Sequence, residues 1–377
     1  MNQVYRFAAP GRTEIGGNHT DHQHGCVLAA AVDLETTAEV TFNEDRVIRV
    51  FSEGYDPVEI PVDDLLIRRE EKGTTAALVR GVAANLQLRG VKLRGMDMKI
   101  RSDVLPGSGL SSSAAFEVLI GNVLNDMCDG DLDPMELAMA GQWAENTYFG
   151  KPCGLMDQSV SALGGLVFLD FKDPAHPIAD RVYFDFADEG YDICIVNCGA
   201  DHANLTAEYA AIPAEMGAVA KFFGKTALRE VQESQVLAAL PELRKTLSDR
   251  AILRALHYFR EDRRVRFMVH ALRNGYFDAF LDMVNESGRS SWEYLQNIVP
   301  AGSVQRQDMA MALALCESLL KGRGACRVHG GGFAGTVQAF VPQDLTAQFV
   351  AGIDAVFGPG ACRAMHIRPE GGRRIRE

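Results

Sequence analysis

The sequence predicts an α+β protein with two domains, and three observations support this prediction. The chain has 377 residues, of which 47% are hydrophobic, which is enough for more than one core. Segments typical of strands and of helices both occur along it. A glycine-rich turn at residues 107–109 stands between a predicted strand and a predicted helix, an arrangement that suits anion binding.

The first third of the chain is rich in predicted strands. The small apolar residues Val27–Val32 and the alternating β-formers Thr36–Phe42 indicate extended structure. Apolar residues at helical spacing follow in the segment 75–89. In order, we expect strands at 4–10 and 26–42, a hairpin at 46–61 broken near residues 54–57, a helix at 75–89, and a strand at 95–104 that leads into the glycine turn.

Helices and strands alternate in the middle of the chain. A helix is expected from Ala114 to Leu124, and Asp133-Pro134 opens another that runs to about Phe149, because proline suits a first helical turn. Strand-like segments follow at 164–170 and 192–198, with a polar break at 172–177 between them. We place the domain boundary between these strands, giving domains 1–185 and 186–377.

The second domain is predicted to be mostly helical from about residue 205 to 320, with Pro213, Pro241 and Pro300 marking helix ends or kinks. The basic segment 260–273 is interpreted as a solvated helix face. A helix at 307–321, a glycine turn, a strand at 336–341, a helix at 345–357 and a strand at 361–367 complete the chain.

Composition excludes several classes of function. A net charge of −12 disfavours general nucleic-acid or anionic-membrane binding, and neither a leader peptide nor a membrane-spanning run is recognisable. Eight scattered cysteines without a CxxC pair disfavour zinc and disulfides and favour a reducing cytoplasm. His19, His22 and His24 have spacings that can bind metal, but the adjacent Gly25 favours a loop that faces a polar ligand.

The most informative segment is Leu105–Ala115, LPGSGLSSSAA. Its glycines allow backbone N–H groups to point inward, and the helix start behind them adds unpaired donors and a positive dipole end. These features predict a phosphate cradle; a simple serine–glycine helix cap is the alternative. The loop lacks the lysine of a Walker loop and the spacing of a dinucleotide fingerprint. The cradle comprises Gly107, Ser108, Gly109, Leu110, Ser111, Ser112 and Ser113.

Two further segments occur in a fixed order around this loop. Ala9–Asp21 reads APGRTEIGGNHTD, and Gly324–Gly335 reads GACRVHGGGFAG. With the serine loop, they resemble the three signature motifs of the GHMP small-molecule kinases. The first motif, together with Pro152–Gln158 (PCGLMDQ), is similar to that of galactokinases. The resemblance covers nearly the whole chain. It implies two α+β domains, a mixed-sheet N-terminal domain and an antiparallel-sheet C-terminal domain with helices, with the active site in the cleft between them.

The resemblance also implies the parts needed for phosphoryl transfer, which depends on placement and charge neutralisation. Mg²⁺ would be held by the Ser113 hydroxyl and the Glu145 carboxylate, both hard oxygen ligands. Asp157 would be the base, facing the anomeric hydroxyl of the sugar, and Arg12 would lie beside the transferred phosphoryl group. Burial and Arg12 shift the pKa of Asp157 in opposite directions, so the sequence gives no net direction. Without the resemblance, Glu145 would be taken for an ordinary surface carboxylate.

The implied sugar site comprises Asn18, His19, Thr20, Asp21, Gly154 and Tyr209. A carboxylate such as Asp21 can accept hydrogen bonds from two neighbouring sugar hydroxyls, which favours one epimer over another. Tyr209 also fits an ordinary core position. The triple glycine 330–332 would bring backbone close to the ligand, although a simple turn between a helix and a strand is the alternative.

Three departures from the galactokinase pattern stand out. Asn18 replaces a glutamate that faces the far end of the sugar, and an amide both donates and accepts without carrying a charge. The segment 75–81 lacks the aromatic residues that the family often has near the adenine. Ala334 occupies a usual glycine position.

The predicted function is ATP- and Mg²⁺-dependent phosphorylation of D-galactose at its C1 hydroxyl, in the cytoplasm and within galactose metabolism. One alternative is a related sugar-1-kinase for galacturonate, N-acetylgalactosamine or arabinose, which Asn18 motivates. Another is a non-catalytic sugar sensor, which the intact serine loop and Asp157 disfavour. The expected partners are a small sugar and ATP, without nucleic acid or membrane; a monomer is favoured and a dimer stays open.

Overall fold

The computed structural model describes residues 3–104, 109–151, 153–199, 205–333 and 335–376. Its contacts divide the chain into two compact units. Unit 1 comprises residues 1–12, 30–165 and 367–377, and unit 2 comprises residues 13–29 and 166–366. The units interleave along the chain, and the single domain boundary at residues 185 and 186 stays a prediction.

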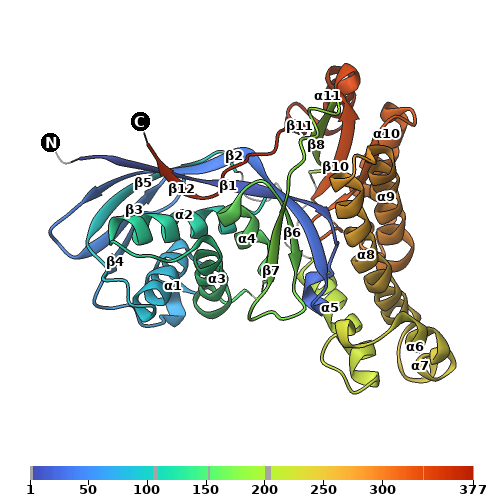
Figure 1. Cartoon of the computed structure of the whole chain (residues 1–377), viewed down its shortest axis with the longest axis horizontal. Helices are drawn as coiled ribbons and strands as arrows, with labels where there is room; N and C mark the ends of the chain where they lie inside the picture. Colours follow the sequence, from blue (N-terminus) through green and yellow to red (C-terminus); the bar gives the residue numbers. More distant parts are fainter. Residues whose placement is uncertain (1–2, 105–108, 152, 200–204, 334, 377) are drawn as a thin grey trace. The chain divides into compact units, whose positions relative to one another are not determined.

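Unit 1 contains most of a mixed sheet whose strands lie in the order β12-β1-β2-β5-β3-β4 (Figure 1). The pair β3–β5 is parallel, whereas β1–β12, β2–β5 and β3–β4 are antiparallel. The mixed sheet of the predicted fold is therefore confirmed. The strands are β1 (Tyr5–Gly16), β2 (Cys26–Phe42), β3 (Val47–Ser52), β4 (Val58–Pro61), β5 (Met96–Ser102) and β12 (Arg373–Ile375).

The helices of unit 1 pack on one another and cover one face of this sheet (Figure 1). Asp133 caps α3 through a capping box with Glu136, and Pro134 starts the helix, as its sequence predicts. The α-helical hydrogen bonding of α3 gives way to a π-helical turn at Glu145, a feature frequent at functional sites. The helices are η2 (Arg69–Glu71), α1 (Thr75–Leu88), α2 (Ser112–Met127), α3 (Pro134–Ala144), η3 (Glu145–Phe149) and α4 (Met156–Leu163).

Unit 2 contains a four-stranded sheet in the order β11-β8-β10-β9, and all of its pairs are antiparallel, as predicted. Its apolar side chains form one core with α10 and α11. The two strands β6 and β7 pair with each other, and β6 also pairs with β2. The strands are β6 (Leu166–Asp170), β7 (Ile178–Val182), β8 (Tyr191–Asn197), β9 (Ala325–His329), β10 (Thr336–Pro342) and β11 (Cys362–Met365).

A second core in unit 2 lies among helices, mainly between α5 and α8. The predicted helical character of this region is confirmed. Of the prolines expected at helix ends or kinks, Pro213 lies inside α5 and Pro241 lies at the start of α7. The helices are η1 (Asp21–Gln23), α5 (Thr206–Phe222), η4 (Leu228–Glu230), α6 (Glu233–Ala238), α7 (Leu240–Thr246), α8 (Asp249–Arg273), α9 (Phe277–Ser290), η5 (Ser291–Leu295), α10 (Asp308–Leu320) and α11 (Gln343–Phe357).

Three strands, β7, β9 and β12, lie where no strand was predicted. The expected direct step from the helix at 307–321 to the glycine turn is wrong, because β9 lies between them. Arg327 and His329 conceal this strand in the sequence, since both are polar and yet fully buried. The short β12 contains adjacent arginines and forms only through its long-range pairing with β1.

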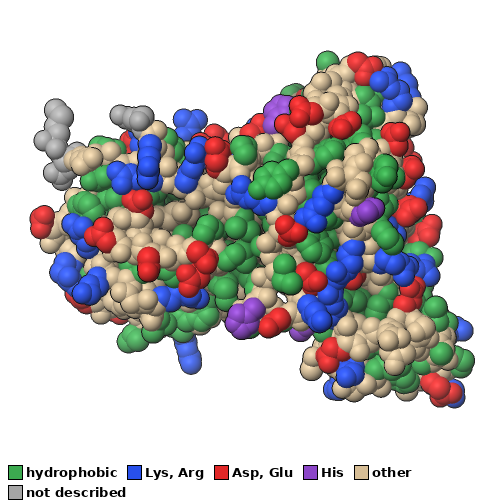
Figure 2. All heavy atoms as spheres, viewed as in Figure 1, with side chains coloured by type: hydrophobic (Ala, Val, Ile, Leu, Met, Phe, Trp, Pro, Cys, Tyr) green, Lys and Arg blue, Asp and Glu red, His purple; other side chains and the backbone are tan. Residues whose placement is uncertain are grey.

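The distribution of charged side chains and the hydropathy of the helices agree with the amino-acid composition. Acidic and basic side chains are interspersed over the face shown in Figure 2. Within the described parts of the chain, no helix has both the length and the apolar character that crossing a membrane would require.

Candidate active site

Arg12 and Asp157, which are far apart in the sequence, form a bidentate ion pair within unit 1. Arg12 lies on β1, and Asp157 lies in the first turn of α4. Nε of Arg12 donates to Oδ1 of Asp157 at 2.7 Å, and Nη2 donates to Oδ2 at 2.8 Å. Such parallel charge-assisted bonds fix orientation as well as charge. The predicted arginine–aspartate couple is therefore present.

The same arginine also donates hydrogen bonds to the described part of the predicted phosphate loop. Its Nη1 donates to the carbonyl oxygen of Gly109 at 2.5 Å, and its backbone N–H donates to that of Leu110 at 3.0 Å. Gly11 permits this approach, since a Cβ there would lie 2.9 Å from the Leu110 oxygen. Gly107 and Ser108, the first residues of the predicted cradle, lie outside the described residues.

Ser111 connects the loop to Asp157. It is the N-cap of α2 and has φ +61°, a left-handed conformation that costs a non-glycine residue about 1 kcal/mol or more. Its hydroxyl donates a short hydrogen bond to Oδ2 of Asp157. Ser112 and Ser113 form the first turn of α2, where backbone N–H groups have no helical partner.

The charge state of Asp157 results from two opposing effects. Burial raises the pKa of this carboxyl, but the Arg12 guanidinium, the Ser111 hydroxyl and the Lys151 ammonium lower it, and the net direction is below the ordinary 3.8. The Asp157 side chain is still 30% exposed. Asp157 is thus an ionised carboxylate that a hydroxyl group can reach.

Glu145 and Ser113 also lie together, as predicted. The Ser113 hydroxyl donates to Oε1 of Glu145 at 3.3 Å, and Nζ of Lys151 approaches the same oxygen to 3.2 Å. Glu145 is 3% exposed, so it is not the ordinary surface carboxylate of the alternative interpretation. It is the first residue of the π-helical turn η3.

Sequence reasoning missed Glu117 and Gln158, which complete this cluster. Nε2 of Gln158 donates to Oε2 of Glu117 at 2.9 Å and to Oε2 of Glu145 at 3.0 Å. Glu117 is fully buried, and its Oε1 has no partner among the described residues. Burial, followed by the charge of Glu145, raises the pKa of Glu117 well above 4.5. Its signal in the sequence was that Glu117 is the one charged residue of the predicted helix 114–124.

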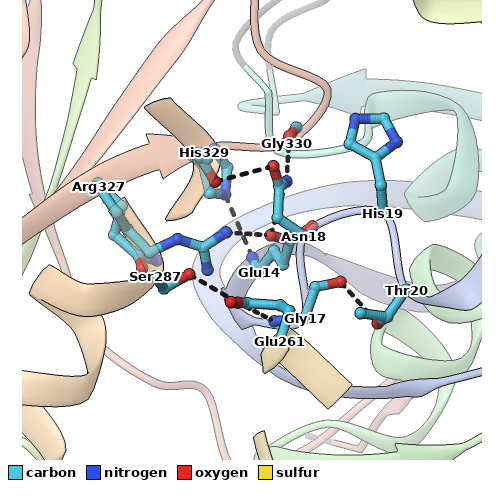
Figure 3. Close-up of polar contacts among 12 residues, drawn as sticks. Glu14, Gly17, Asn18, His19, Thr20, Glu261, Ser287, Arg327, His329 and Gly330 are labelled. Atoms are coloured by element: carbon cyan, nitrogen blue, oxygen red, sulfur yellow. Dashed lines mark hydrogen bonds and ion pairs between the residues drawn. The ribbon is translucent and has the colours of Figure 1, made fainter. Parts of the chain in front are cut away.

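In unit 2, Asn18 is fully buried, and its amide is satisfied by protein groups (Figure 3). Nδ2 donates to Oε1 of Glu14 at 3.1 Å and to the carbonyl of Gly330 at 2.6 Å. Oδ1 accepts from Nδ2 of Asn297 at 2.8 Å and from the Ser291 hydroxyl at 3.5 Å. The first and third motifs are thereby joined within unit 2.

Glu14 carries a negative charge beside Asn18. It pairs with the fully buried Arg327, whose Nη2 lies 2.5 Å from its Oε1 (Figure 3). This position was not among the predicted site residues. The sequence did not signal it, because the strand was expected to end at residue 10, whereas β1 continues to Gly16 and is buried from Phe7 onward.

His19 lies against the triple glycine. Its Nε2 donates to the carbonyl of Gly331 at 3.0 Å, because a carbonyl can only accept. Burial, with the nearby His22, lowers the pKa of His19 to about 3, so the ring is neutral at pH 7. Its Nδ1 is then an acceptor, buried and without a partner among the described residues.

Tyr209 supports the same turn. Its hydroxyl donates to the carbonyl of Gly332 at 2.9 Å, and a Cβ on Gly331 would lie 2.6 Å from its ring. Tyr209 also contacts Phe333 edge-to-face. The third motif is therefore a packed turn in unit 2, close to the candidate tyrosine.

The remaining predicted sugar residues differ in their surroundings. The Thr20 hydroxyl donates to the carbonyls of Gly17 and Cys26 at 2.8 and 2.6 Å, which closes the loop that contains it. Asp21 starts η1, and its carboxylate accepts from the backbone N–H of His22 at 2.9 Å. Gly154 belongs to unit 1 and lies just before α4.

Models of known protein families match two parts of the chain. Residues 77–165 match the model of the GHMP kinase N-terminal domain, and residues 2–42 match the galactokinase galactose-binding signature. The fold is the GHMP kinase fold. A sugar kinase, which is a phosphotransferase, is the class that these matches indicate, and within the GHMP kinases the chain resembles galactokinases.

Solved structures share this fold over nearly their whole length. The structure of Lactococcus lactis galactokinase complexed with galactose is 24% identical, with a TM-score of 0.84 over 99% of this chain and 95% of that one. Methanococcus jannaschii mevalonate kinase is 12% identical, with a TM-score of 0.68 over 97% and 98% of the two chains. A putative sugar kinase from Campylobacter jejuni is 16% identical, with a TM-score of 0.69 over 99% and 98%.

Proposed function

We propose that this protein transfers the γ-phosphoryl group of ATP to the C1 hydroxyl of D-galactose. The observation that carries the proposal is the Asp157 carboxylate, which Arg12 holds through two hydrogen bonds and Ser111 through a third, directly beside the glycine–serine loop. The match of residues 2–42 to a galactose-binding signature supports the choice of sugar.

In the proposed reaction, Asp157 accepts a hydrogen bond from the C1 hydroxyl and orients its oxygen toward the γ-phosphorus. The lowered pKa of Asp157 keeps it ionised and makes it a weak base, so orientation contributes more than early proton removal. As the C1 oxygen attacks and the bond to the leaving ADP breaks, its proton passes to Asp157. Arg12 and the N-terminus of α2 offset the charge on the phosphoryl oxygens.

The residues present fit a divalent cation. Ser113 and Glu145 offer two hard oxygen donors 3.3 Å apart, and Glu117 adds a buried carboxyl oxygen without a partner among the described residues. Glu145 and Ser113 would hold Mg²⁺, which supplies charge neutralisation of the ATP phosphates when bound. Gln158 would orient Glu145, because it donates to the carboxylate oxygen that faces away from Ser113.

The sugar would be read by the loop after β1. The neutral His19 offers Nδ1 as an acceptor, and Asp21 offers a carboxylate that can accept from two adjacent hydroxyls. The chain itself links this loop to the phosphoryl site, since β1 contains Arg12 and Asn18 follows the end of that strand.

The test is an ADP-release assay with ATP, Mg²⁺ and a panel of galactose, galacturonate, N-acetylgalactosamine, arabinose and glucose. We expect turnover with galactose, and ³¹P NMR of the product should show phosphorus coupled to the anomeric proton. Turnover of another sugar alone would remove the galactose assignment and keep the kinase. Sugar and ATP binding without any turnover would instead identify a sensor.

One observation favours a different sugar. The amide of Asn18 is satisfied within unit 2, and the carboxylate of Glu14 is paired with Arg327, so neither residue brings an unpaired negative charge to the loop. An acidic sugar such as galacturonate would then be repelled less than by a free glutamate at position 18. A higher kcat/KM for galacturonate than for galactose would establish this alternative.

A further inference from the structure

The loop at residues 17–26, which we call the sugar-motif loop, is held at its first end by α8. The carboxylate of Glu261 accepts from the backbone N–H of Gly17 at 3.1 Å (Figure 3). Nε2 of His257, one helical turn earlier, donates to the carbonyl of Asn18 at 3.0 Å. Two adjacent residues of the loop are therefore bound through their backbones, independently of their side chains.

The other end of the loop is held by Asp262, which follows Glu261 on α8. Oδ1 of Asp262 accepts from the backbone N–H of Cys26 at 2.8 Å, and the same oxygen accepts from Nη1 of Arg229 at 3.1 Å. One helix therefore binds both ends of the sugar-motif loop, through the side chains of His257, Glu261 and Asp262. All of these residues belong to unit 2.

The side chains of α8 that bind the loop are themselves held in place by burial and by further hydrogen bonds. Glu261 and His257 are fully buried. The hydroxyl of Ser287, on α9, donates to Oε1 of Glu261 at 2.6 Å (Figure 3). Arg264 pairs with the other carboxylate oxygen of Glu261. The Ser290 hydroxyl donates to Nδ1 of His257, within 2.9 Å. A side chain bound on both sides has little freedom to follow a moving loop.

The loop has a single closed geometry between these anchors. Gly17 has φ +99°, and a Cβ there would lie 2.6 Å from the carbonyl oxygen of Cys26. Thr20 bridges the two ends by donating to the carbonyls of both. A Cβ on Gly25 would collide with Thr20 and with Tyr258 of α8. Displacing one end therefore moves the whole loop.

We propose that His257, Glu261 and Asp262 of α8 are positioning residues for sugar binding, which act by fixing the sugar-motif loop that presents His19 and Asp21. This inference rests on the proposed function for its consequence in catalysis. Its physical basis is preorganisation: a loop already held in its binding geometry loses less conformational entropy when a sugar binds.

The first test needs no ligand. Amide hydrogen exchange of peptides that cover residues 17–26 is compared between the wild type and Glu261→Leu, with Glu286→Gln as the matched control. Glu286 contacts the same Arg264 but is about half exposed. We expect faster exchange in these peptides for Glu261→Leu and no change for Glu286→Gln. Unchanged protection in Glu261→Leu would overturn the inference.

The second test separates positioning from a general structural role. Glu261→Leu should raise the KM for the sugar on the order of tenfold, since misplacing a binding group by about 1 Å costs up to about 100-fold. The KM for ATP should stay unchanged. Glu261→Gln, which still accepts from Gly17, should restore part of the loss. An equal rise in both KM values, or a fall in thermal stability alone, would contradict the proposal.

A second pair of variants tests the positioning role if Glu261→Leu does not fold. The same measurements on His257→Phe, with His257→Gln as the variant that can still donate to Asn18, give the same contrast. The two proposals also fail separately. If the wild type phosphorylates no sugar in the panel, the proposed function fails; if it does and loop exchange is unaffected by both variants, only the positioning role fails.

Discussion

Replacing Asn18 by glutamate would put a second carboxylate beside Glu14. In the structure, Nδ2 of Asn18 donates to Oε1 of Glu14 at 3.1 Å, in a fully buried setting. Asn18→Glu removes this donor and the one to Gly330. Arg327 is already paired with Glu14 through Nη2. The variant therefore confines two negative charges where the wild type has one.

The new carboxylate can either stay ionised and be repelled by Glu14, or one of the two carboxyl groups can take up a proton. The response that costs less free energy sets the loss of stability. Two unit charges 3.1 Å apart repel by about 5 kcal/mol at an effective dielectric constant of about 20. Taking up a proton from solution at pH 7 costs at most about 3.7 kcal/mol, for a reference pKa of about 4.3 and about 1.36 kcal/mol per unit. Protonation is cheaper, so one carboxyl of the pair becomes neutral in the folded state.

The penalty consequently depends on pH with a definite sign. The pair has a pKa raised above the unfolded value, so its cost is absent below about pH 4.3 and grows as the pH rises. We expect Asn18→Glu to lower the free energy of unfolding by up to about 3.7 kcal/mol at pH 7 and by about 1 kcal/mol at pH 5, in addition to a pH-independent loss from Gly330.

The assay is urea unfolding of the wild type and the variant at both pH values. Two controls isolate the charge. Asn18→Leu loses the same hydrogen bonds without adding charge, so its loss should be equal at pH 5 and pH 7. The double variant Glu14→Gln/Asn18→Glu keeps one carboxylate for Arg327, so it should lose the pH dependence. A loss for Asn18→Glu that is the same at both pH values would refute the reasoning and show that Arg327 neutralises both carboxylates.

Four further outcomes are expected. Asp157→Asn should lower kcat by about 10²- to 10⁴-fold with sugar and ATP binding retained, and a loss below tenfold in steady-state assays would reject its role. Arg12→Met should move the acid limb of the kcat/KM profile to higher pH, because it removes the strongest effect that lowers the pKa of Asp157 and leaves burial opposed only by Ser111 and Lys151; an unmoved limb would contradict the electrostatic role. The raised pKa of Glu117 should make the wild type less stable as the pH rises above about 4.5, by up to about 1.4 kcal/mol per pH unit, and Glu117→Gln should remove this loss. The same pH dependence of the free energy of urea unfolding in both proteins from pH 5 to 7 would count against it. Gly17→Ala should destabilise the protein by about 1–3 kcal/mol in thermal or urea unfolding, with Gly275→Ala as a control for a positive φ without a nearby contact, and equal losses in both would rule out the clash at Cys26.

Hydrophobic periodicity was sufficient for most of the elements. β2 occupies the predicted residues 26–42, and α1 and α3 begin within a residue of their predicted starts. Local signals decide these elements: β-branched alternation in β2 and a capping box with proline in α3. β9 escaped because it contains the buried polar residues Arg327 and His329. β12 escaped because it contains two arginines and pairs with β1, which is distant in sequence.

The residues of the candidate site also fall into those that the sequence predicted and those that it missed. The residue types of Arg12, Ser111, Ser113, Glu145 and Asp157 were readable because each stands in a short motif. Gln158 and Glu14 were missed because nothing local distinguishes a buried polar partner from an exposed one, and Glu117 was marked only by being the one charged residue of the predicted helix 114–124. Glu261 was concealed inside the segment 260–273, which was interpreted as a solvated helix face, although it is fully buried. His257 is also fully buried and lies just before that segment.

By itself, the sequence indicated the class of chemistry, because its three motifs resemble, in the same order, the signature motifs of the GHMP small-molecule kinases. Tertiary structure alone decided which charges are neutralised and which polar groups are already satisfied. Arg12 lowers the pKa of Asp157, and the amide of Asn18 is consumed by Glu14, Gly330 and Asn297. The physical reason is that pKa values and hydrogen-bond capacity depend on distances between residues that the chain order does not specify.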